Sequence, residues 1–236
     1  MNGIVIIDKP QDWTSQDVTA RLRRVFNTRR IGHGGTLDPM ATGVLPVFVG
    51  RATRGVEFFE HAEKTYEATL RLGVTTDTED ITGTVLEEKQ VSLTEADFLA
   101  VLPQFRGEIL QIPPMYSALK INGQKLCDLA RKGKEVELKA KPLVVSEIEL
   151  LRCDLPTIEI RVVCSKGTYI RALARDIGEA LKSGGHLTGL RRTRVGKISI
   201  GDCMNVDDAV ELLNTVELTF PEDYQPTQKQ NGTNTN

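Results

Sequence analysis

The sequence predicts an α+β protein built on a mixed β-sheet. Stretches with the two-residue period of strands and stretches with the helical period follow one another without a regular strand–helix–strand repeat, which argues against a doubly wound parallel sheet. The chain has 236 residues, 40% hydrophobic and 26% charged, enough for a packed core. No apolar run could span a bilayer, and the N-terminus lacks a basic leader, so we expect a cytoplasmic protein.

Periodicity and capping residues place the elements along the chain. Apolar residues recur at helical spacing after Thr14 and Ser15, either of which can cap a helix, and Tyr66 falls on the apolar side of an alternating strand. In the first half of the chain we expect a strand at 4–7, a helix to residue 26, a strand at 44–49, a helix at 52–62, strands at 65–72 and 84–88, and a helix at 94–102. After these we expect a hairpin around 121–125, a helix ending near Gly133, strands at 144–151 and 158–163, a helix to residue 182, a β ribbon at 187–200 broken at Gly196, and a helix at 206–213. The buried face of the helix to residue 182 would be Ala172, Leu173, Ile177, Ala180 and Leu181.

Prolines and polar runs predict the irregular parts. Pro46 within the strand at 44–49 indicates an edge strand or a bulge, because proline cannot donate to a sheet ladder. Residues 74–83 are polar and predict a loop, and residues 107–120 have a stiff centre at Pro113 and Pro114. From Pro221 the composition turns to Gln, Asn, Thr, Gly and Pro, which is typical of disorder.

Charge is distributed unevenly, which matters more than the net charge of -2. Residues 21–54 carry seven arginines and one acid, residues 119–142 carry seven bases and three acids, and residues 182–197 carry five bases and no acid. Screening limits charge effects to about 10 Å at moderate salt, so local basic patches can bind phosphates on a neutral protein. Chance clustering on a solvated surface is the alternative, and three separate stretches favour RNA binding.

The sequence contains no pattern for a metal or a nucleotide cofactor. The four cysteines and three histidines are scattered, with no paired cysteines. There is also no phosphate-binding glycine loop and no dinucleotide, hydrolase or zinc-protease motif. We therefore expect reduced thiols, no metal and a reaction that needs no cofactor.

The segment at residues 29–46 concentrates the features of a reactive site. It contains four glycines, and Asp38 is the single acid between Arg21 and Arg54. Pro39 restricts where the Asp38 carboxylate can point, and Gly34-Gly35 lets a ligand approach the backbone. An Asp-Pro pair by itself is typical of an ordinary tight turn, so the cationic surroundings carry the functional interpretation.

The residues alone predict an RNA-facing site with one catalytic acid. A carboxylate beside an arginine stays ionised and oriented, and such a carboxylate is a competent nucleophile toward carbon. An inward tyrosine can stack on a base. Two structural alternatives stay open at this point: Tyr66 as an ordinary core tyrosine, and the helix that carries Arg171 and Arg175 as an amphipathic helix with surface arginines.

Several ordered blocks resemble one family. The sequence resembles the bacterial tRNA pseudouridine synthases of the TruB family from Gly3 to Ile200. The matching blocks are GIVIIDKP at 3–10, GHGGTLDP at 32–39 with ATGVL at 41–45, KTY at 64–66 with LGVTTDT at 72–78, IPPMYSALK at 112–120, CSKGTYIR at 164–171 and LRR at 190–192.

The resemblance implies a pseudouridine synthase fold, with a mixed, mainly antiparallel sheet flanked by helices and loops around a central cleft. It implies isomerisation of uridine to pseudouridine at position 55, in the TΨC arm of tRNA. Asp38 would be the nucleophile, Tyr66 would pack on the target base and move a proton, and Arg171 would pair with Asp38. Whether the acid bonds to the sugar, bonds to the ring or acts as a base is left open.

The resemblance also implies five substrate-binding or supporting residues. His33 would help splay the arm and stack where the base leaves, and Leu190 would wall the pocket. Lys9 would support the site, Asp80 would be the acid on the loop after the strand of Tyr66, and Tyr169 would be a second aromatic beside the pocket.

The C-terminal part departs from the pattern of many family members. We expect a catalytic domain at 1–201 with an RNA-facing insertion around 105–142, then a short acidic helix and a disordered tail at 202–236 in place of a full RNA-binding domain. The expected partner is tRNA, and we expect no membrane, no obligate protein partner and a monomer. The alternatives are a tRNA-folding chaperone without catalysis and an RNA-guided synthase subunit.

Overall fold

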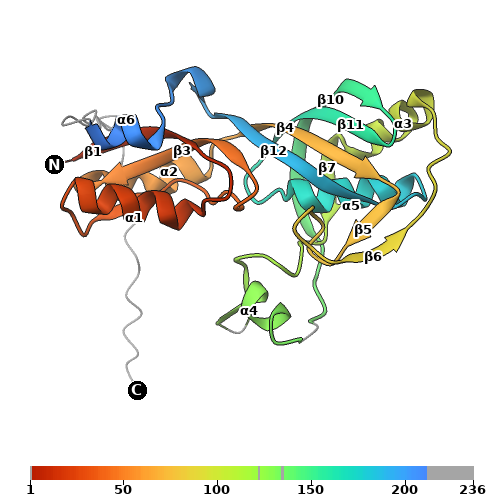
Figure 1. The fold of residues 1–236 in the computed structure, drawn as a ribbon, viewed down its shortest axis with the longest axis horizontal. Helices are drawn as coiled ribbons and strands as arrows, with labels where there is room; N and C mark the ends of the chain where they lie inside the picture. Colours follow the sequence, from red (N-terminus) through yellow and green to blue (C-terminus); the bar gives the residue numbers. More distant parts are fainter. Residues whose placement is uncertain (1, 122, 134–135, 212–236) are drawn as a thin grey trace.

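A mixed sheet organises the protein (Figure 1). The computed structural model describes residues 2–121, 123–133 and 136–211, and nine strands in these ranges form one sheet. Its path is β1 (Gly3–Lys9), β3 (Thr42–Val49), β12 (Gly185–Val195), β4 (Lys64–Leu72), β11 (Thr157–Cys164), β10 (Lys141–Asp154) and β7 (Gly107–Gln111), with β2 (Ile31–His33) on β3 and β13 (Ile198–Ser199) on β12. Within this sheet the β12–β3 pair is parallel and the other strand pairs are antiparallel, which confirms the predicted mixed, mainly antiparallel sheet.

Short hairpins and helices complete the described chain. The hairpins are β5 (Val74–Thr76) with β6 (Val85–Glu88), and β8 (Lys120–Ile121) with β9 (Gln124–Lys125). The α-helices are α1 (Ser15–Val25), α2 (Val56–Glu60), α3 (Glu95–Val101), α4 (Leu126–Ala130), α5 (Ile170–Ala180) and α6 (Val206–Glu211), and the 3-10 helices are η1 (Gly50–Gly55), η2 (Leu102–Phe105) and η3 (Ile200–Asp202).

Local sequence explains where these elements begin. Thr14 caps α1 in a capping box with Asp17, which satisfies backbone N–H groups that the helix leaves unpaired. Thr94 caps α3 in the same way with Asp97. In β4 every second side chain is buried, Tyr66 among them, which confirms the alternation expected for this strand.

Two larger hydrophobic cores and a small third cluster around Phe48 pack on the sheet. One core packs α1 and α6 against β1 and β3, through residues such as Val18, Leu22 and Val47. The other packs α5 and α3 against β4, β10 and β11. In Figure 1 β12 crosses from one side of the molecule to the other, with β3 on one side and β4 on the other. Loops from both halves therefore meet where β3 and β12 join.

Four sequence expectations are wrong or incomplete, and two others fall outside the described residues. Residues 74–76 form β5, which pairs with β6, and residues 107–111 form β7, for which we predicted no strand. Ala180 is exposed, because α5 ends there. Strand β3 is an internal strand, and its register with β1 is unbroken at Pro46. On the other side of β3, β2 pairs with residues 47–49 and β12 with residues 42–43, so the N–H that Pro46 lacks is not needed for a strand pair. The expected tail from residue 221 and the last two residues of the helix at 206–213 lie outside the described residues.

The segment after residue 201 packs on the first core. The Met204 N–H donates to the Ile6 carbonyl at 3.0 Å, and the Met204 carbonyl accepts from Asp8 at 2.9 Å. Val206 and Ala209 of α6 are buried with the residues of α1. The described part of this segment therefore belongs physically to the body of the protein, whereas the domain division itself stays a prediction.

Candidate active site

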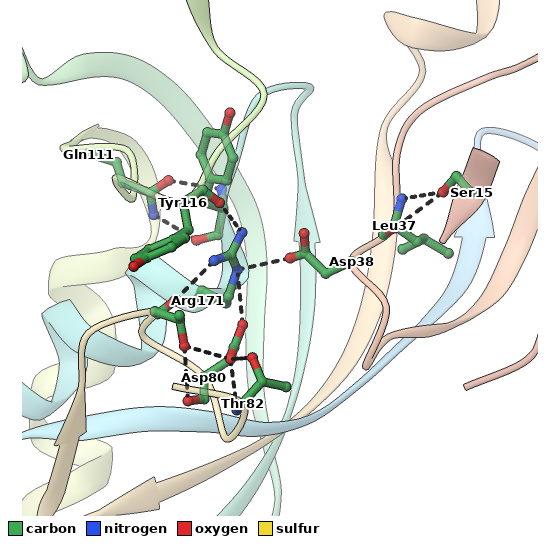
Figure 2. Close-up of polar contacts among 10 residues, drawn as sticks. Ser15, Leu37, Asp38, Asp80, Thr82, Gln111, Tyr116 and Arg171 are labelled. Atoms are coloured by element: carbon green, nitrogen blue, oxygen red, sulfur yellow. Dashed lines mark hydrogen bonds and ion pairs between the residues drawn. The ribbon is translucent and has the colours of Figure 1, made fainter. Parts of the chain in front are cut away.

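The loop that carries Asp38 is held on both sides of that residue. Ser15, the first residue of α1, has its hydroxyl 2.9 Å from the Leu37 nitrogen and 3.2 Å from the Leu37 carbonyl. On the other side, the Asp12 N–H donates to the Pro39 carbonyl at 2.8 Å. Asp12 lies between β1 and α1, and Ser15 begins α1, so elements of the first core hold the backbone on both sides of Asp38; Figure 2 draws the contacts of Ser15 with Leu37.

Lys9 is part of the same support. Its side chain is fully buried, and its Nζ lies 2.8 Å from the Pro10 carbonyl, 2.5 Å from that of Trp13 and 3.2 Å from that of Pro39. Burial lowers the pKa of Lys9 to about 8, and the Asp38 charge acts in the opposite direction. The three donors of the Lys9 ammonium group are occupied by these backbone carbonyls, so Lys9 holds the loop that carries Asp38.

Arg171 reaches this loop from the first turn of α5. Its Nε lies 2.8 Å from the Asp38 Oδ2, and only 5% of its side chain is exposed (Figure 2). Its Nη1 donates to the Thr78 carbonyl at 3.0 Å and its Nη2 to the Tyr116 carbonyl at 2.9 Å. The ion pair predicted between Asp38 and Arg171 is therefore present, and the guanidinium is fixed from three directions. The alternative of a surface arginine is wrong at this position.

Asp80 is a second carboxylate near the Arg171 guanidinium. Its Oδ2 lies 3.7 Å from the Arg171 Nε, and its Oδ1 accepts from the Thr78 hydroxyl at 2.8 Å and from the Thr82 N–H at 2.9 Å. The residue is only 4% exposed. Asp80 thus lies beside the Asp38–Arg171 pair, where its carboxylate contacts the arginine and holds the turn at residues 78–82.

A second arginine of α5 steadies the same two loops. Arg175 lies one turn after Arg171, and it pairs with Glu79 and donates to the Ile112 carbonyl at 2.9 Å. Residues 78–80 and 112–116 are therefore both attached to α5 by guanidinium groups. This arrangement makes the helix the rigid support of the site.

The Asp38 carboxyl combines burial with access. Burial raises the pKa of Asp38 above its ordinary value, and the Arg171 guanidinium opposes the rise. The sequence predicted only the second of these effects, because burial of a loop residue cannot be recognised from composition. Its side chain is still 36% exposed, so a substrate can reach the oxygen that Arg171 does not bind.

Tyr66 and Leu190 lie on the two central strands. Tyr66 is 8% exposed on β4 and lies opposite Arg192 of β12, and Leu190 lies opposite Ala68. Burial raises the pKa of Tyr66, with the Arg192 guanidinium acting in the opposite direction. Asp38 is among the charges that act on this phenol, so the predicted acid and tyrosine share one environment.

Tyr169 and His33 border the site. Tyr169 is the residue directly before α5, and the Gln111 carboxamide binds its backbone twice, accepting from the N–H at 2.9 Å and donating to the carbonyl at 3.1 Å. Burial raises the pKa of the Tyr169 phenol. His33 ends β2 just before the Asp38 loop, and burial lowers its pKa. Its Nδ1 is buried without a hydrogen-bond partner within the described chain.

Sequence reasoning missed three supporting residues. Ser15 was considered only as a helix cap, and Gln111 gave no signal beyond being polar next to a proline-rich stretch. Arg192 was counted among phosphate-binding bases, which is wrong because it is 1% exposed. Its donors go to the Val44 carbonyl at 2.8 Å and the Gly35 carbonyl at 3.1 Å.

Three further observations concern metal ligands, membrane-spanning helices and surface hollows. In the ranges that the structure covers, no three His, Cys, Asp or Glu side chains are placed to share a metal ion. No described helix has the length and apolarity needed to cross a membrane. A surface hollow of about 680 Å³ lies between α3 and β10, and none of the predicted site residues lines it.

Comparison with known proteins points to one family. A family model for the N-terminal domain of TruB family pseudouridylate synthases matches residues 23–170, and one for the C-terminal domain of tRNA pseudouridylate synthase B matches residues 171–224. The tRNA pseudouridine synthase B of Phocaeicola vulgatus is 50% identical over 228 residues, covering 91% of this chain and 94% of that protein. The one of Parabacteroides distasonis is 49% identical over 224 residues, covering 88% and 93%.

A solved structure has the same fold. A chain in the crystal structure of a Cbf5-Nop10-Gar1 complex matches with a TM-score of 0.69 and 32% identity. The match covers 89% of this chain and 54% of that one, so this chain spans about half the length of its structural relative.

Proposed function

The chain belongs to the TruB family of pseudouridine synthases, enzymes that isomerise uridine in tRNA, and we propose that its target is the uridine at position 55 in the TΨC arm. One observation carries the catalytic part of this proposal, which is the 2.8 Å contact between Arg171 Nε and Asp38 Oδ2, with the second carboxylate oxygen left for a substrate. A bound, oriented carboxylate in a loop that is anchored on both sides fits the role of a nucleophile.

The reaction rearranges bonds within one nucleotide. The bond from uracil N1 to the ribose C1′ breaks, the base turns, and C5 bonds to C1′ in its place. The proton on C5 leaves and a proton is taken up at N1, so the atoms balance without cofactor, oxidant or reductant. We propose Asp38 as the nucleophile in this exchange, with Arg171 keeping its carboxylate oriented and opposing its protonation.

The other predicted residues surround the base. We propose that Tyr66 packs on the flipped uracil and moves a proton, that Leu190 forms one wall, and that Tyr169 is the second aromatic. Extrusion of a base costs a few kcal/mol, and His33, at the end of β2, would stack where the base leaves. Their positions on neighbouring strands and on the loops of the Asp38–Arg171 pair support these roles.

Basic surfaces outside the site would hold the RNA. We propose the stretches 21–54, 119–142 and 182–197 for phosphate binding, without the buried Arg192 in the last stretch. Because phosphate binding releases counterions, RNA affinity should fall steeply as salt rises. The protein would act as a cytoplasmic monomer without an obligate protein partner.

The test uses purified protein and an unmodified tRNA transcript, with no cofactor added. Pseudouridine at the single TΨC-arm site supports the proposal. A matched transcript with cytidine at that position is the control, and it should bind but give no product. Binding of the normal transcript without any product would favour a tRNA-folding chaperone, and product only in the presence of a guide RNA would favour an RNA-guided subunit.

A further inference from the structure

Arg192 is a buried cation whose charge has no counter-ion among residues 2–121, 123–133 and 136–211. It is 1% exposed, and its guanidinium donates to the backbone carbonyls of Val44 and Gly35. Removing an ion from water costs several kcal/mol unless its donors are well satisfied. Its neighbour Arg191 shows the contrast, because that side chain is 38% exposed and pairs with Asp8 at 2.7 Å.

The guanidinium ties both ends of the segment that carries Asp38. Its Nη2 donates to the Gly35 carbonyl at 3.1 Å, and its Nε donates to the Val44 carbonyl at 2.8 Å. Gly35 has a φ of +99°, and a Cβ built there would lie 3.5 Å from the Arg192 Nη1, so the loop backbone lies directly against the guanidinium. One side chain therefore sets the distance between the start and the end of the catalytic loop.

The same guanidinium lies beside the phenol of Tyr66. Arg192 and Tyr66 are register partners on the paired strands β12 and β4. A side-chain hydrogen bond joins Arg192 and Tyr66. A guanidinium has donors and no acceptor, so the Tyr66 oxygen accepts in this contact. The hydroxyl proton of Tyr66 is then left to point elsewhere.

The charged and titratable groups around Tyr66 agree with this direction. Arg192 on β12 lowers the pKa of the phenol, whereas Cys164 on β11 and Asp38 on the loop raise it, as does burial, which is the largest effect. Arg192 is thus the cation, among the groups facing Tyr66, that favours its anionic form.

We propose that Arg192 is a positioning residue that joins the Asp38 loop to Tyr66, fixing the loop at Gly35 and Val44 and orienting the Tyr66 hydroxyl so that its proton faces the bound uracil. This inference rests on the proposed function, because it assigns Tyr66 a proton-handling role in pseudouridine formation. Arg192 does not touch the substrate and acts through the two groups that do.

A double-mutant cycle tests the coupling. Single-turnover rates are measured at saturating tRNA for the unchanged protein, Arg192→Gln, Tyr66→Phe and the double variant. Loss of a charge-assisted contact predicts a fall of about 10- to 100-fold for Arg192→Gln, with the tRNA Kd within about twofold of the unchanged protein. Part of the loss comes from the loop and persists in the Tyr66→Phe background, so there Arg192→Gln should cost a smaller factor in rate than in the parent. Equal losses in the two backgrounds would overturn the inference.

Two controls separate a folding defect from a positioning defect. Arg161→Gln removes an exposed arginine of β11 that pairs with Glu149, and it should keep the parent rate. If Arg192→Gln fails to fold, the cycle is run with Arg192→Lys, which keeps the charge but has one nitrogen for contacts that the guanidinium makes with several. If the unchanged protein forms product but the effects of the two substitutions are additive, the inference about Arg192 is wrong and the proposed function stands. If the unchanged protein forms no product, the proposed function itself is wrong.

A second readout needs no activity. Tyr66 is replaced by 3-fluorotyrosine, and its ionisation is followed by fluorine NMR as the pH is raised. Because a neighbouring cation favours the phenolate, the titration midpoint should lie about one pH unit lower with arginine at position 192 than with glutamine. The same label at Tyr169 is the control and should not shift between the two proteins. An unchanged midpoint at position 66 would show that the guanidinium does not act on this phenol.

Discussion

The Arg171 Nε lies 2.8 Å from the Asp38 Oδ2, although the two residues are far apart in the sequence and belong to different halves of the fold. Asp38 is positioned by α1 and the segment after β1, and Arg171 by α5. The pair therefore forms only when both cores are complete and the β3–β12 junction holds them in register. Under the proposed function, catalysis would therefore depend on correct assembly of both halves.

Asp38→Asn should abolish pseudouridine formation while leaving tRNA affinity within about twofold, since the amide has nearly the same shape but is not a nucleophile. The fold should persist, because Arg171 keeps its bonds to the Thr78 and Tyr116 carbonyls. Product is measured after complete digestion of the tRNA, and affinity by filter binding. Asp154→Asn, at an exposed acid that pairs with Arg152, is the matched control and should behave like the parent. Measurable turnover by Asp38→Asn would rule out the nucleophile assignment.

The rate of the unchanged protein should fall as the pH drops through the raised pKa of Asp38, because only the carboxylate can attack. Arg171 favours that carboxylate, so Arg171→Gln should raise the pKa further and move the acidic limb of the rate profile to higher pH. The measurement is a single-turnover pH profile at saturating tRNA. Arg152→Gln, on the exposed part of β10, is the control. A limb that stays in place in Arg171→Gln would contradict the electrostatic role.

Lys9→Met should change the pH dependence of stability. In the folded protein the pKa of Lys9 is lowered from 10.5 to about 8, so between these values the unfolded chain binds the proton and the folded chain does not. Lys9 therefore makes the free energy of unfolding rise as the pH increases from about 8 to 10.5, by up to about 3 kcal/mol. The variant should lack this rise. At neutral pH the variant leaves three carbonyls without their donor, which costs about 1–3 kcal/mol. Urea unfolding at a series of pH values measures both effects, and an identical slope in parent and variant would contradict the lowered pKa.

Gly43→Ala should disrupt the junction of β3 and β12. A Cβ on Gly43 would lie 2.2 Å from the Arg192 carbonyl oxygen, and the residue has a φ of +105°. Gly107→Ala is the matched control, because it has a φ of +87° with nothing within 4 Å of the added Cβ, so it isolates backbone strain from steric clash. We expect about 1–2 kcal/mol of destabilisation in the control and about 3 kcal/mol more in Gly43→Ala, with a loss of activity only in the latter. Equal unfolding free energies in the two variants would show that β3 can move away from β12 without cost.

Patterns within single elements were readable from the sequence. The alternation of 65–72 placed Tyr66 on the buried face of β4, and the capping residues Thr14 and Thr94 marked the starts of α1 and α3. These features depend on residues within a few positions of one another, which is why periodicity and capping reveal them. The strand β7 was missed because its exposed edge carries no clear alternation, with Leu110 73% exposed.

The sequence by itself determined the periodic elements, the glycine-rich loop with its single acid, and, through ordered family blocks, the residues that gather around it. Only the tertiary structure decided which arginine makes which contacts: Arg171 binds Asp38, Arg175 ties loops to α5, and Arg192 is buried against the loop that carries Asp38. The reason is physical. A guanidinium looks the same in every stretch of sequence, and its role follows from whether the folded chain surrounds it with carbonyls, carboxylates or water, which is settled by contacts between residues far apart along the chain.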